Sequence, residues 1–89
     1  MKVLSSNKDL YDYLLLLSSE LKQRGETTLS EAVLFAAGQA SSLSTEFLGE
    51  SRIALRQVSN EENGVLTKQE RADLSSVLKQ LDKALPRGR

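Results

Sequence analysis

The apolar residues of this chain recur with the spacing of α-helices from one end to the other. Leu10, Leu14, Leu17 and Leu21 follow one another at intervals of three or four positions, which places them on one face of a helix. No segment shows the alternation of apolar and polar residues that is typical of a half-buried strand. The spacing therefore predicts an all-α protein.

Capping and breaking residues divide the pattern into segments. Gly25 follows the first segment, where a left-handed residue commonly closes a helix, and Pro86 disfavours helix at the residue before it. The predicted helices span residues 7–24, 29–40, 45–60 and 68–85. Because the connections are short, we expect a compact antiparallel bundle of four helices.

Two of the four predicted helices begin with the spacing of a capping box. In this motif a Thr side chain accepts a hydrogen bond from the third residue of the helix, and a Glu at that position bonds back to the Thr amide. Thr28 with Glu31 has this spacing at the second helix, and Thr67 with Glu70 has it at the fourth.

The second predicted helix is apolar on nearly every side. Residues 29–40 include only three polar side chains, and several small residues would let neighbouring backbones approach closely. A helix that is apolar all round is typically buried. We therefore predict that it is the central helix, with Val33, Leu34 and Phe35 filling the space around it.

The length of 89 residues predicts a single helical domain over residues 1–89, with frayed ends at residues 1–5 and 86–89. The longest wholly apolar run, Ala32 to Ala37, has only six residues. A membrane span needs about 20 such residues, and the first residues lack the apolar core of a signal peptide. We therefore expect a cytoplasmic protein without a membrane segment.

The composition excludes several kinds of chemistry. The chain has no His and no Cys, so it lacks the commonest general base and the thiolate nucleophile, as well as the commonest ligands of transition metals. We expect no catalytic residues, no cofactor and no metal, and hence no enzymatic activity. The 12 basic and 12 acidic residues cancel, which makes nucleic acid an unlikely partner because such binding depends on accumulated positive charge.

Four apolar residues lie off the predicted core faces: Tyr11, Leu15 and Leu16 on the first helix, and Ile53 on the third. Tyr11 and Leu15 are four positions apart on one flank of the first helix, and Ile53 has Glu50 and Arg56 as its neighbours on the third helix. Apolar residues rimmed by charge are typical anchors of protein contacts. We predict Tyr11, Leu15, Glu50, Ile53 and Arg56 as partner contacts. The alternatives are that the first helix is wedged between two others, and that Ile53 is an ordinary exposed aliphatic residue.

Three functional hypotheses follow in order of preference. The first is a non-enzymatic helical module that binds another protein or associates with itself, comparable in size and class to small bacterial adaptor, inhibitor or immunity proteins. The second is a nucleic-acid-binding regulator with a core like a helix-turn-helix, although Glu46 and Glu50 would then face phosphates. The third is a hydrolase that depends on such carboxylates.

Overall fold

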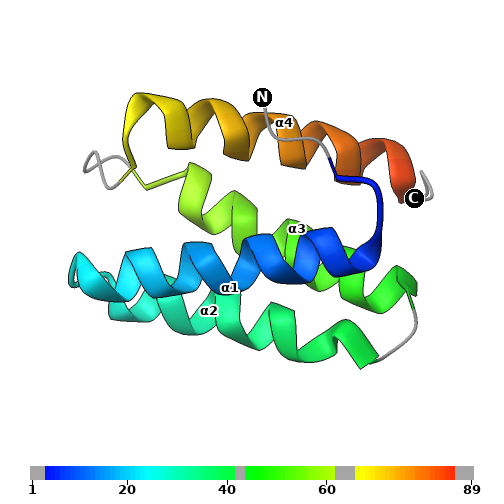
Figure 1. Ribbon diagram of the computed structural model, residues 1–89, viewed down its shortest axis with the longest axis horizontal. Helices are drawn as coiled ribbons and strands as arrows, with labels where there is room; N and C mark the ends of the chain where they lie inside the picture. Colours follow the sequence, from blue (N-terminus) through cyan, green and yellow to red (C-terminus); the bar gives the residue numbers. More distant parts are fainter. Residues whose placement is uncertain (1–3, 42–43, 62–65, 86–89) are drawn as a thin grey trace.

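The computed structural model describes residues 4–41, 44–61 and 66–85. Within these ranges the chain forms four α-helices and one short 3₁₀-helix, and no strand. The elements are α1 (Asn7–Gln23), α2 (Thr27–Ala37), η1 (Gly38–Ser41), α3 (Ser44–Ser59) and α4 (Lys68–Ala84). Successive α-helices run in opposite directions (Figure 1). The predicted all-α four-helix bundle is therefore confirmed.

The second helix has the predicted central position. It packs against α1 on one side and α3 on the other, and α3 in turn packs against α4 (Figure 1). Because α4 lies beyond α3, it does not cover the outer side of α2.

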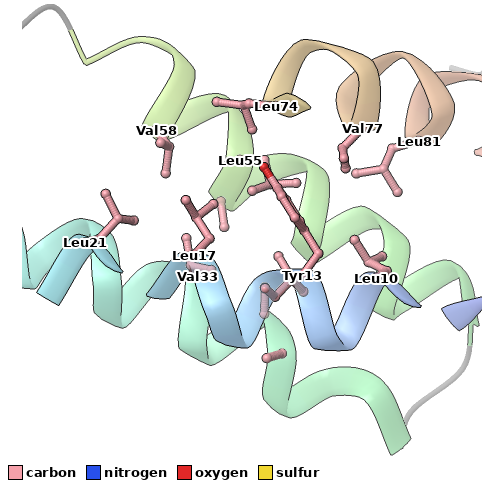
Figure 2. Packing of buried hydrophobic residues seen from close by; sticks show 14 of the residues in the cluster. Leu10, Tyr13, Leu17, Leu21, Val33, Leu55, Val58, Leu74, Val77 and Leu81 are labelled. Atoms are coloured by element: carbon pink, nitrogen blue, oxygen red, sulfur yellow. The ribbon is translucent and has the colours of Figure 1, made fainter. Parts of the chain in front are cut away.

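One continuous core joins all four helices. Figure 2 shows leucines and Tyr13 of α1 facing apolar side chains of α3 and α4. The fully buried large side chains are Leu10, Leu14, Leu21, Val33, Phe47, Leu55, Val77 and Leu81. Every one of them follows the three- and four-residue spacing of its helix, which is why the core face could be assigned from the sequence.

Two buried serines connect α1 to α2. The Ser18 hydroxyl lies 3.0 Å from the Ser30 carbonyl oxygen, and the Ser30 hydroxyl lies 2.8 Å from the Ser18 carbonyl oxygen. Both side chains are buried, and each donates to the backbone of the other, so neither hydroxyl loses hydrogen bonding on burial. The pair fixes the antiparallel register of α1 against α2.

The ends of α1 agree with the capping signals. The Ser6 hydroxyl accepts from the Asp9 amide at 3.2 Å, and Gly25 adopts a left-handed conformation at φ 81° after the last turn. Of the segments predicted to fray, residues 1–3 and 86–89 lie outside the described residues. The Leu4 amide, just before α1, donates to the Gln80 side chain of α4 at 2.9 Å.

The start of α2 differs from its prediction. The helix begins at Thr27 with Glu26 as its N-cap, and no side chain caps it. The predicted capping box of Thr28 and Glu31 is therefore wrong. The physical reason is the preceding turn, in which the Glu26 amide donates to the Leu21 carbonyl at 2.9 Å. This bond closes the turn at Glu26, and the next residue already belongs to the helix.

Candidate interaction surface

The outer side of α2 is exposed, in contrast to the prediction that its large apolar residues fill the interior. Val33 is fully buried, whereas Leu34 and Phe35 are 51% and 61% exposed. The error has a simple cause. A segment that is apolar all round does not indicate which side faces inward, and among the described helices α2 packs mainly against α1 and α3.

Phe35 and Ile53 come together on this exposed side. Phe35 lies on α2, Ile53 lies on α3 with 54% of its side chain exposed, and both line the same shallow hollow of about 170 Å³. We call this the α2–α3 surface. Its residues are Ala32, Phe35, Glu50, Ile53, Ala54 and Gln57.

The helical register explains why these residues share one hollow. On α3, Ala54 is buried beside α2 while Ile53, one position earlier, points away from the core. On α2, the small Ala32 lies one turn before Phe35 and leaves space between the two helices. Small side chains therefore line the hollow together with the two large apolar side chains.

Charged residues flank the α2–α3 surface on α3. Glu50 lines the hollow itself and forms no ion pair with any described residue. Arg56 lies on the other side of Ile53, toward α4, where its guanidinium is 3.4 Å from Asp82. Arg52 contacts the same Asp82 oxygen at 3.2 Å. The predicted group of Glu50, Ile53 and Arg56 thus shares one outer face of α3, and Phe35 is the residue that sequence reasoning missed.

Tyr11 and Leu15 belong to a different surface. They are 37% and 36% exposed on α1, on the flank that faces α2. Ser18 contacts Ser30 across the antiparallel pair of α1 and α2. Leu15 lies about one turn before Ser18, and Leu34 lies about one turn after Ser30. Leu15 and Leu34 are therefore at the same level along the two helices. The predicted contact residues therefore fall on two surfaces, one on either side of α2.

A third feature joins α1 to the start of α4. The Arg24 guanidinium forms two hydrogen bonds to the Glu70 carboxylate, at 2.6 and 2.8 Å. These bonds lower the pKa of Glu70 to about 2. Partial loss of solvation raises the pKa of Glu20 above its ordinary value, and the nearby Glu70 carboxylate raises it as well.

Tyr13, Glu20, Glu70 and Asp73 line a hollow beside this contact, together with the apolar Leu16 and Leu17. Burial is the main cause that raises the pKa of the Tyr13 phenol, so this hydroxyl stays protonated at neutral pH. Among the described residues, no group of three acidic, His or Cys side chains is placed to hold a metal ion. The arrangement clamps the end of α1 to the beginning of α4.

Comparisons with protein-family models, with curated proteins and with solved structures found no significant match. In the part of the chain that the structure describes, no helix is both long and apolar enough to cross a membrane.

Proposed function

We propose that this chain is a non-enzymatic protein-interaction module and that the α2–α3 surface is its contact surface. One observation carries the proposal. Phe35 and Ile53 are large apolar side chains on adjacent helices, each more than half exposed, and they line the same hollow.

The exposure of Phe35 is costly for a protein of this size. The chain has only two phenylalanines, and Phe47 is fully buried while Phe35 lies at the surface. Full burial of a Phe side chain stabilises a folded protein by about 1.5–3 kcal/mol, and the monomer lacks most of this stabilisation at Phe35. Aromatic side chains beside a pocket, with polar residues around them, are the usual anchors of protein interfaces.

The chemistry of the hollow supports binding rather than catalysis. Among its lining residues Glu50 is the one titratable group, and Gln57 supplies an amide. Neither is a nucleophile with an adjacent base, which covalent catalysis requires. The outer face of α3 also carries Glu46 and Glu50, and these carboxylates disfavour contact with the phosphates of nucleic acid.

Site-specific photocrosslinking in the source cells tests the proposal. Phe35 is replaced by the photoreactive p-benzoylphenylalanine, and a matched variant carries the same group at Ala72, an exposed position on α4. We expect one discrete adduct from position 35 that is absent from position 72. The adduct should disappear when Ile53→Asp is added to the same chain.

Two results would contradict the proposal. One is the absence of any adduct from position 35, and the other is the same set of adducts from both positions. Circular dichroism of each variant shows whether the helical fold is retained. The mass of the adduct identifies the partner, which is either another protein or this chain itself.

A further inference from the structure

We propose that the occupant of the α2–α3 surface is a second copy of this chain. This inference rests on the proposed function and specifies its partner. In the proposed dimer the two α3 helices pack antiparallel across a two-fold axis at Ile53, and the two Phe35 side chains meet beside that axis.

The charge pattern of α3 is self-complementary about Ile53. Glu50 lies three residues before Ile53 and Arg56 three residues after it. In an antiparallel two-fold pair, a residue before the centre of one helix is level with the residue equally far after the centre of the other. Each Glu50 is therefore level with Arg56 of the second copy, and the symmetry forms this contact twice.

A parallel pairing of the same helices would have the opposite effect. It would place each Glu50 level with the other Glu50, and each Arg56 level with the other Arg56. Like charges at a contact disfavour association, and unlike charges fix the register of an interface. The positions of these two side chains therefore select the antiparallel arrangement.

Gly49 gives independent support for close approach of another helix. A glycine in the middle of a helix destabilises it by about 0.5–1 kcal/mol relative to alanine. Within the described part of the chain nothing requires it, because no heavy atom lies within 4 Å of the position that a Cβ would occupy. In the proposed dimer Gly49 is level with Gln57 of the second copy, four residues after its Ile53, and leaves room for that longer side chain.

The apolar residues complete the centre of this interface. Phe35 lines the same hollow as Ile53 and Ala54, so it lies near the level of the proposed axis. Two-fold symmetry then brings both Phe35 side chains together beside the two Ile53 side chains. Ala32 and Ala54 also line the hollow, and their small side chains leave space for an aromatic ring.

Contacts within one copy do not oppose this pairing. Arg56 is 3.4 Å from Asp82, but Arg52 contacts the same carboxylate oxygen at 3.2 Å and can remain there. Release of an exposed ion pair costs little. With 12 basic and 12 acidic residues, two copies carry no net charge that would repel.

The proposed interface would take up a limited share of the surface of the chain. A stable interface buries about 800 Å² from each partner. That is about a seventh of the 5623 Å² that the chain exposes. The outer residues of α2 and α3 around Phe35 and Ile53 must therefore contribute as well, and we expect a dimer that dissociates on dilution.

Charge reversal with mixing tests the pairing directly. Sedimentation velocity is measured for the wild-type chain, for Glu50→Arg, for Arg56→Glu and for an equimolar mixture of the two variants. Each variant alone would bring like charges together at both contacts, so we expect its dimer association constant to fall at least roughly tenfold. In the mixture, the introduced arginine of one variant is level with the introduced glutamate of the other. The unchanged Arg56 of the first is level with the unchanged Glu50 of the second, so we expect mixed dimers to form.

Lys83→Glu is the matched control, because it makes the same charge change as Arg56→Glu on an exposed part of α4 and should leave the dimer intact. Circular dichroism of each variant measures whether its helices are retained. A wild-type chain that stays monomeric at every concentration overturns the second-copy proposal, while a crosslink from Phe35 to a different protein would still support the proposed function. A wild-type dimer whose variants fail to pair when mixed overturns the antiparallel arrangement.

Discussion

At the scale of single residues, Ser51 is the clearest unfavourable feature of the core. It is fully buried on α3, and its hydroxyl has no hydrogen-bond partner among the described residues. A buried polar group without a partner loses its hydration and gains nothing in return. Replacement by alanine also favours the helix.

We therefore expect Ser51→Ala to raise the free energy of unfolding by about 1 kcal/mol, which corresponds to an increase of about 4–8 °C in Tm for a domain of this size. Urea denaturation and thermal melts measure the change. Ser75→Ala, at an exposed position on α4, is the matched control and should change stability by less than about 0.5 kcal/mol. A loss of stability in Ser51→Ala would mean that the buried hydroxyl does form a hydrogen bond.

At this scale the burial of a side chain could be predicted from the sequence where polar residues mark the opposite face of its helix. Phe47 lies on a helix with charged residues on its opposite face, so its burial could be assigned from spacing. Phe35 lies in the segment 29–40, in which nearly all residues are apolar, and nothing there distinguishes the inner side from the outer. Only the placement of α1 and α3 around α2 decides that Phe35 is exposed.

At the scale of the secondary-structure elements, the two predicted capping boxes had different outcomes. At α4 the motif is confirmed. The Glu70 amide donates to the Thr67 hydroxyl at 3.1 Å, and the Thr67 amide donates to the Glu70 carboxylate at 2.9 Å. At α2 the same spacing lies inside a helix that begins at Thr27. The Thr-x-x-Glu spacing is the same at both helices. At α2 the turn that closes at Glu26 makes the helix begin at Thr27, so Thr28 is not in the capping position.

This contrast predicts different effects of the same substitution. Thr67→Ala removes a side-chain acceptor from the start of α4 and should lower the free energy of unfolding by about 1 kcal/mol. Thr28→Ala removes no capping bond, because Thr28 is an exposed residue within α2, and alanine has the higher helix propensity. Its stability should be unchanged or slightly higher. Equal losses in urea denaturation of the two variants would show that Thr28 does cap α2.

The clamp between α1 and α4 predicts a dependence of stability on pH. Hydrogen bonds from Arg24 hold the pKa of Glu70 at about 2 in the folded state, below its ordinary value of 4.5. A carboxylate with a lowered pKa stabilises the folded state above the ordinary value, and this stabilisation is lost as the pH falls toward the folded value. The raised pKa of Glu20 acts in the opposite direction.

We therefore expect Glu70→Gln to lower stability most above about pH 4.5, with a difference from wild type that disappears as the pH approaches 2. The glutamine oxygen can still accept from the Thr67 amide, so the substitution tests the contact with Arg24 more than the cap. Chemical denaturation across this pH range measures the difference. A difference that stays constant with pH would show that ionisation of Glu70 does not stabilise the fold.

At the scale of the whole molecule, helix number, order and antiparallel packing followed from spacing and breaking residues alone. What the sequence could not specify was the arrangement of the four helices around their core. In the structure α4 packs against α3 and leaves the outer side of α2 uncovered, so apolar residues on two different helices become one exposed surface. A sequence pattern assigns faces to single helices, whereas a surface that spans two helices depends on how they pack.

The exposed surface connects stability to association. A domain of this length buries only about 60–65% of the surface of its unfolded chain, so its stability alone is modest. Any partner that binds the folded state and not the unfolded chain stabilises the fold by mass action. A dimer of this chain would therefore make its thermal stability depend on its own concentration.

If the partner is a second copy, the Tm of the wild-type chain should rise by several degrees over roughly two decades of protein concentration. Phe35→Ala should abolish this rise and leave the Tm at low concentration nearly unchanged, because Phe35 is mostly exposed in the monomer. Phe47→Ala is the contrasting variant, since it removes a fully buried ring and should cost about 3–5 kcal/mol at every concentration. Thermal melts followed by circular dichroism measure all three chains. A wild-type Tm that does not depend on concentration would contradict self-association within the range tested.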